Sequence, residues 1–113
     1  MQYTIAEIEN LSALEFSPDA EIVFFVEEDR GEEYAEWVIR SSAPAKFPEE
    51  TWEGGSDSTI ALIKSVVPNE DLGAAKSSAS VDGIWENKTG KWQAKSVETD
   101  KGFYLLLEFF KRK

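Results

Sequence analysis

The chain has 113 residues, of which 42% are hydrophobic and 12% aromatic, and its formal net charge is −10 at neutral pH. This length and apolar content predict a single folded domain over residues 1–113. Cysteine and histidine are both absent, which excludes disulfides, thiolate zinc sites, cysteine nucleophiles and Ser–His–Asp catalysis.

The remaining motifs narrow the chemistry further. The seven glycines form no phosphate-binding loop, and no calcium-loop pattern occurs. We therefore expect a protein that is not an enzyme and that uses no cofactor and no metal. Because no apolar run approaches the roughly 20 residues that cross a bilayer, and the N-terminus lacks the basic and apolar regions of a signal peptide, we expect a soluble, cytoplasmic protein.

The first predicted element is a short helix over residues 5–14. Thr4 and Glu7 fit a capping box, in which each side chain bonds the other residue's backbone. A strand is the alternative for this segment. The helix is favoured by apolar residues that recur at helical spacing, namely Ile5, Ile8, Leu11 and Leu14.

A β-hairpin follows. Its predicted strands are Glu21–Glu28 and Glu33–Ser41, joined by a four-residue loop in which Gly31 supplies the positive φ. This loop length predicts a register with one wholly apolar face. The predicted pairs are Ile22 with Ile39, Phe24 with Trp37, Val26 with Ala35, Glu21 with Arg40, and Phe25 with Glu36.

The middle of the chain gives weaker signals. Residues 42–57 contain two prolines and two glycines without periodicity, which predicts a long loop carrying Phe47 and Trp52. Residues 58–67 fit a helix that ends at Pro68, although their β-branched residues leave a strand as the alternative. We expect loop over residues 68–80.

The C-terminal third predicts a β-meander. Val81–Glu86 and Lys91–Val97 form a second hairpin, and Phe103–Phe110, apolar on both faces, forms a central strand. The predicted fold is α+β: an antiparallel sheet of about five strands, with one or two short helices on one face. An all-β sandwich or barrel is the alternative. The hairpin register pairs Trp85 with Trp92, Glu86 with Lys91, and Asp82 with Lys95.

Function is indicated mainly by the distribution of charge. Residues 1–57 hold fifteen acids and three bases (3 − 15 = −12), whereas residues 58–113 hold seven acids and nine bases (9 − 7 = +2). Charge asymmetry of this kind bears on partners rather than on fold. We therefore predict a protein-binding module, an inhibitor that imitates nucleic acid and docks on a basic protein surface. The candidate binding residues are Glu27, Glu28, Asp29, Glu32, Glu33, Glu36 and Trp52, with further acids at Glu49, Glu50 and Glu53.

Three alternatives remain open from the sequence. The acidic residues can serve solubility alone, and apolar strand edges can make the chain a self-assembling structural subunit. The third alternative is a single-strand nucleic-acid binder, although direct binding is opposed by the negative charge and by a register that separates rings from lysines. The residues for this alternative are Lys88, Lys91, Lys95, Lys101, Trp85, Trp92, Phe103 and Tyr104.

Overall fold

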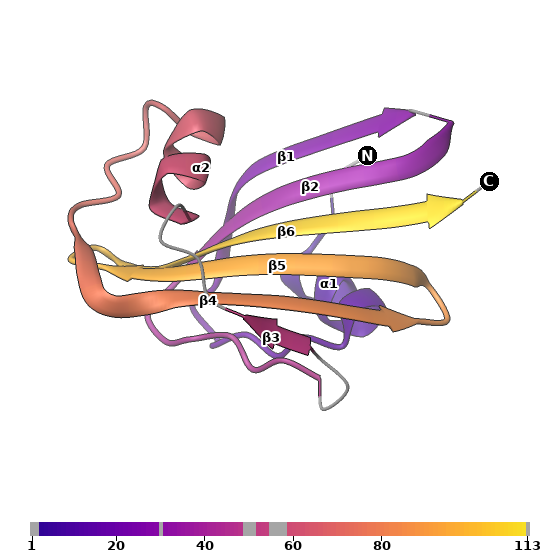
Figure 1. Cartoon of the computed structure of the whole chain (residues 1–113), viewed down its shortest axis with the longest axis horizontal. Helices are drawn as coiled ribbons and strands as arrows, with labels where there is room; N and C mark the ends of the chain where they lie inside the picture. Colours follow the sequence, from indigo (N-terminus) through magenta and orange to yellow (C-terminus); the bar gives the residue numbers. More distant parts are fainter. Residues whose placement is uncertain (1–2, 30, 49–51, 55–58, 113) are drawn as a thin grey trace.

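Six antiparallel strands form one continuous sheet, with a short helix on each of its faces. The computed structural model describes residues 3–29, 31–48, 52–54 and 59–112. The strands are β1 (Glu21–Asp29), β2 (Glu32–Ser41), β3 (Trp52–Gly54), β4 (Ala75–Asn87), β5 (Gly90–Thr99) and β6 (Gly102–Arg112). Their order across the sheet is β1-β2-β6-β5-β4-β3, so β1 and β3 form the two edges (Figure 1). This is the predicted α+β class, with the three-residue β3 as a strand beyond the predicted set.

Both predicted helices are confirmed. Helix α1 (Ile5–Ser12) begins with the complete capping box, because Thr4 Oγ1 accepts from the Glu7 backbone N–H and Glu7 Oε1 accepts from the Thr4 backbone N–H. It ends two residues earlier than predicted, at Ser12, because the C-cap residue Ala13 is left-handed with φ of 68°. Helix α2 (Thr59–Val66) stops before Pro68, so helical periodicity outweighs the β-branched residues there.

The two helices lie on opposite faces of the sheet, which corrects the prediction that both pack on one face (Figure 1). On the α1 face, Ile8 packs with Trp37 and Leu107. On the α2 face, Ile63 packs with Val38 and Leu106. Neighbouring residues of one strand point to opposite faces, so β2 and β6 need a cover on each side.

The C-terminal meander is confirmed, including its register. Trp85 faces Trp92, and Asp82 faces Lys95, with 3.7 Å between the Asp82 and Lys95 charged groups. Strand β6 lies between β2 and β5, as the doubly apolar run Phe103–Phe110 predicts.

The register of the first hairpin departs from the prediction after two pairs. Ile22 faces Ile39 as predicted, but the pairing then shifts, and Trp37 faces Phe25 instead of Phe24. The shift is a bulge between Ile22 and Phe24, which takes one residue out of the ladder and exchanges the two faces beyond it. The loop is correspondingly shorter than predicted, since Asp29 already faces Glu33.

Two predicted loops contain strands. Residues 52–54 form β3, which pairs with β4 through Trp52 and Ile84, although we predicted no strand in residues 42–57. Strand β4 begins at Ala75, inside the segment predicted as loop over 68–80. Its first part is irregular, with a register shift between Ala75 and Ser80. Small residues there give little β signal, which explains the error.

Candidate functional site

The candidate acidic residues do not share one face of the first hairpin. Strand alternation puts Glu27, Asp29 and Glu33 on the α1 side and the other three on the α2 side. The six candidate acids therefore do not form a single ladder of carboxylates on one face. The remaining three lie on the same face as Tyr34: Glu32 and Glu36 are each two residues from it on β2, and Glu28 is its partner on β1.

Four of the six acids nevertheless meet at the end of the hairpin. A hollow of about 500 Å³ is lined by Glu27, Glu28, Asp29 and Glu33, together with Tyr3, Tyr34, Ala35 and Phe109. All four acids are exposed. We call these four residues the acidic tip. They belong to the last three residues of β1 and the second residue of β2, and the short loop between the two strands brings them together.

Burial and the acids on the α1 side of the hairpin raise the pKa of Tyr3. Burial raises the pKa of its phenol, and the negative charges of Glu27, Glu33 and Glu7 raise it further. Its ring lies 5.5 Å from the rings of Phe25 and Trp37, which fixes it over the hairpin. Three carboxylates from three separate elements, α1, β1 and β2, thus act at one point on the surface. Sequence reasoning missed Glu7, whose role in the capping box gave no sign of this position.

The α2 side of the hairpin carries a second acidic group, which we call the acid pair: Glu36 and Glu108. These residues face each other across β2 and β6, an arrangement that is destabilising for like charges. Tyr34 offsets it, since its hydroxyl donates to Glu36 Oε2 at 2.6 Å and lies 3.0 Å from Glu108 Oε2.

The tyrosine between these carboxylates is held in its neutral form. Burial raises the pKa of Tyr34 most, followed by its hydrogen bond to Glu36 and by the charge of Glu108. Its ring packs 5.2 Å from that of Phe110. Glu108 is the one charged residue within Phe103–Phe110, a signal from which the sequence analysis drew nothing.

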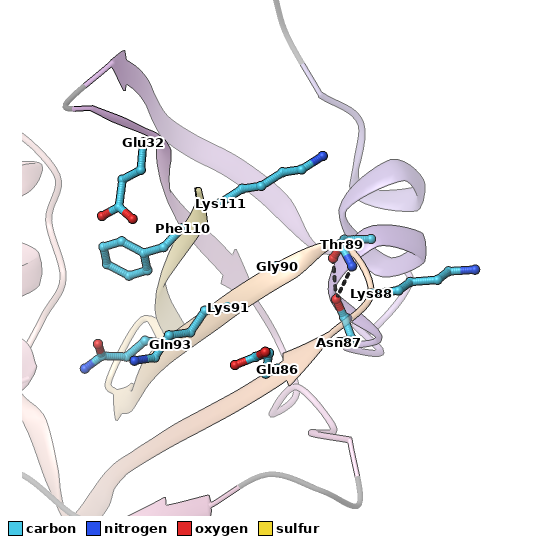
Figure 2. Close-up of a pocket in the computed structure, with 10 residues that line it drawn as sticks. All are labelled: Glu32, Glu86, Asn87, Lys88, Thr89, Gly90, Lys91, Gln93, Phe110 and Lys111. Atoms are coloured by element: carbon cyan, nitrogen blue, oxygen red, sulfur yellow. Dashed lines mark hydrogen bonds between the residues drawn. The ribbon is translucent and has the colours of Figure 1, made fainter. Parts of the chain in front are cut away.

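A larger hollow of about 810 Å³ lies between the two hairpin turns, with mixed charge (Figure 2). Figure 2 shows the ring of Phe110 close to Glu32, with Lys91 and Gln93 on the neighbouring strand. The side chains of Lys88 and Lys111 extend away from it. Its charges are of both signs, so this hollow selects no partner by charge. Its lining residues are Glu32, Glu86, Asn87, Lys88, Thr89, Gly90, Lys91, Gln93, Phe110 and Lys111.

Basic residues of β6 run beside the start of β2. Lys111 faces Glu33 and Arg112 faces Glu32 in the β2–β6 register. The described part of the chain has no ion pair between Lys111 and Glu33. The acidic tip therefore has Lys111 of β6 beside it in the sheet, without an ion pair to Glu33 among the described residues.

The predicted aromatic anchor lies in a strand instead of a loop. The backbone of Trp52 belongs to β3, and the side chains of Trp52 and Glu53 lie outside the described part of the structure, as do Glu49 and Glu50 altogether. Phe47 is half-buried, with its ring 5.8 Å from that of Trp85, so this loop aromatic packs on the core.

The residues of the nucleic-acid alternative do not converge. Trp85 and Trp92 are buried on the α1 face with their rings 6.4 Å apart. On β5, Lys91 and Lys95 are an odd number of residues from Trp92, so they lie on the opposite face, which is the α2 face. The separation of rings and ammonium groups is as predicted.

Polar side chains of the β4–β5 turn hold the end of α1. The hydroxyl of Thr89 and the amide of Asn87 both donate to the Leu11 carbonyl, at 2.9 and 3.0 Å. Trp85 Nε1 donates to the Ser12 carbonyl at 2.7 Å. These bonds satisfy carbonyl groups that a helix end leaves without partners, so this turn serves the fold.

Comparison with known proteins finds no relative of this chain. No protein-family model, curated protein or solved structure matches the chain. Among the described residues, no three acidic side chains converge in a way that could hold a metal ion. Neither helix in that part of the chain is long and apolar enough to span a bilayer.

Proposed function

We propose that this protein is a non-enzymatic protein-binding module whose acidic tip docks on a basic surface of another protein. Glu27, Glu28, Asp29 and Glu33 line one open hollow, and this convergence carries the proposal. A cytoplasmic location belongs to the same proposal.

The electrostatics of the tip support this function. Glu27 and Glu33 form no ion pair within the described part of the chain, and with Glu7 they raise the pKa of Tyr3. An excess of one charge steers an oppositely charged partner and raises its association rate. The net charge of −10 acts in the same direction.

The class of partner follows from spacing. Alternate residues along a strand, such as Glu27 and Asp29, are roughly 7 Å apart, about twice the phosphate rise of one DNA strand. A protein whose basic groove binds nucleic acid would therefore be able to bind the tip in place of phosphates. The inhibitor that imitates nucleic acid is the specific form of the proposal.

Charge reversal at the tip tests the proposal. The immobilised chain is used to capture proteins from the source cells, and captured proteins are identified by mass spectrometry. Glu27→Lys with Glu33→Lys reverses the α1 side of the tip, and Glu28→Lys reverses its α2 side. We expect at least one variant to lose the partner, with a change in unfolding free energy within about 0.5 kcal/mol because these residues are at the surface.

A matched control separates the tip from overall charge. Glu86→Lys with Asp100→Lys makes the same change in net charge as the double variant at exposed positions away from the tip, and it should keep the partner. Equal loss in the control would contradict a docking site at the tip. Duplex DNA should displace the captured protein, and failure to do so would remove the nucleic-acid imitation while leaving docking intact.

A further inference from the structure

The outer side of β1 is a sheet edge that the described chain leaves open. Strand β1 pairs with β2 on one side, and no described segment pairs with it on the other. Figure 1 shows β1 as the outermost strand beside β2. At nine residues, β1 is long for an exposed edge, since such edges are commonly short or covered. The opposite edge, β3, has only three residues.

The residues of this edge have a defined chemistry. Phe24, Phe25 and Val26 are only half-buried, and the exposed acids Glu27–Asp29 follow them directly. A hollow of about 280 Å³ runs along the apolar part, lined by Tyr3, Ile22, Val23, Phe24 and Phe25. The bulge between Ile22 and Phe24 breaks the regular ladder, so regular pairing is available from Phe24 onward.

We propose that β1 binds an extended basic segment of the partner protein, which adds to the sheet as a further strand. This inference rests on the proposed docking function and specifies how the partner is held. Backbone hydrogen bonds along β1 provide affinity, and side chains on both faces provide selection. Glu28 lies on one face and Glu27 and Asp29 on the other, so the segment needs consecutive Lys or Arg residues next to a short apolar run.

The molecule already contains one pairing of this kind. On the inner side of the same hairpin, Phe110 of β6 faces Tyr34, Lys111 faces Glu33, and Arg112 faces Glu32. An apolar residue followed by two basic residues thus matches an acidic strand end within this sheet. Strand β1 has apolar and acidic residues in the reverse order, with the acids last, so an antiparallel segment matching its outer side must read basic residues first and apolar residues after them.

A second copy of the chain is a poor occupant. Antiparallel pairing of two β1 strands would bring the acids Glu27–Asp29 of both copies to one sheet edge, and the net charge of −10 on each copy adds repulsion. The edge therefore favours a partner of opposite charge over self-association.

A synthetic peptide tests strand addition without knowledge of the natural partner. The probe is the blocked peptide Lys-Arg-Lys-Val-Thr-Val-Thr, whose antiparallel pairing places its basic residues opposite Glu27–Asp29, and it is added to the isotope-labelled chain while amide hydrogen exchange is followed by NMR. We expect the outward-facing amides between Phe24 and Asp29 to exchange about tenfold more slowly at saturation. The same peptide with N-methyl groups on every residue cannot donate backbone hydrogen bonds from either edge, and should give no protection.

Variants of the chain and the peptide test the charge requirement. Glu27→Lys with Glu28→Lys should weaken binding of the basic peptide about tenfold, whereas Glu86→Lys on β4 should leave it unchanged. Melting curves confirm that each variant is folded. Replacing the basic residues of the peptide by Gln should weaken binding similarly, and equal binding of that peptide would overturn the basic partner.

The outcomes separate this inference from the docking function. Equal binding of the methylated and parent peptides, or no protection of β1, overturns strand addition even where tip charge reversal still releases the captured protein. Protection of β1 without any captured partner that depends on the tip overturns the docking function instead. Slower exchange that grows with protein concentration and needs no peptide would identify a second copy as the occupant and overturn the proposal.

Discussion

The two hairpin turns lie at the same end of the sheet (Figure 1) but have opposite relations to the rest of the molecule. Asn87 and Thr89 of the β4–β5 turn bind the Leu11 carbonyl of α1. At the β1–β2 turn, the hydrogen bond described is internal, from the Gly31 N–H to Asp29 Oδ1. The β4–β5 turn thus holds a helix, whereas the hydrogen bond described at the β1–β2 turn stays within that turn. Polar residues of similar type therefore bind a distant element in one turn and a neighbouring residue in the other.

The largest expected effect comes from the turn glycines. At Gly90 (φ 150°), an added Cβ would lie 2.7 Å from both Phe109 Cε1 and the Phe110 carbonyl oxygen. We expect Gly90→Ala to lower the unfolding free energy by about 3 kcal/mol, through overpacking and backbone strain. At Gly31 (φ 83°) nothing lies within 4 Å, so Gly31→Ala should cost about 1 kcal/mol from strain alone. Urea denaturation measures both, and equal losses would contradict the contrast between the turns.

A pair of buried tryptophans gives the next effect. In the second hairpin, Nε1 of Trp92 donates to Thr89 Oγ1 at 3.0 Å. In the first hairpin, Nε1 of Trp37 is buried and has no hydrogen-bond partner among the described residues. Trp92→Phe removes volume and a hydrogen bond, for an expected loss of about 2 kcal/mol. Trp37→Phe removes similar volume but also an unsatisfied donor, so its loss should be about 1 kcal/mol smaller.

Guanidinium denaturation of these two variants decides the comparison. A loss for Trp37→Phe as large as that for Trp92→Phe would mean that the Trp37 donor is satisfied in solution. Near-ultraviolet circular dichroism should confirm that the neighbouring rings keep their packing in both variants.

Alkaline pH should weaken the fold gradually. Burial raises the pKa values of Tyr3, Tyr34 and Tyr104 above the ordinary 10.0, so the folded state retains phenolic protons that the unfolded chain releases. The resulting stability is complete below pH 10 and is lost as pH rises through the folded values. The unfolding free energy falls with pH by at most about 1.4 kcal/mol per pH unit for each tyrosine.

Urea denaturation from about pH 9 to about pH 11 measures this slope, with tyrosinate absorbance followed in parallel. Tyr34→Phe should make the slope shallower, because Tyr34 is buried beside two carboxylates. Ionisation of all three phenols near pH 10 in the folded protein would contradict the burial and charge effects described for them.

The sequence predicts the second hairpin better than the first for a physical reason. Trp85 with Trp92 and Asp82 with Lys95 make aromatic and charge pairs that agree on one register. In the first hairpin, Ile22–Val26 is apolar throughout, so a one-residue slip leaves apolar residues on both faces. No glycine marks the bulge, and the register cannot be fixed by alternation there.

The candidate site was predictable in its residues but not in its arrangement. The acids at the end of β1 follow from composition, and strand alternation divides them between two faces, whereas which acid lies on which face depends on the bulge near Val23. The contributions of Glu7 and Glu108 depend on tertiary pairing across distant parts of the chain. The same holds for the opposite placement of α1 and α2, because a short amphipathic helix does not specify which face of a sheet it covers.

The position of β6 also governs when this protein can fold during synthesis. Both hairpins leave the ribosome before β6, yet they meet only through it, since β6 pairs with β2 on one side and β5 on the other. A nascent chain therefore exposes two half-sheets with apolar inner edges until residues 102–112 emerge. Such late, long-range closure is slow and prone to aggregation, which makes the interval before β6 emerges the time at which a chaperone would matter most.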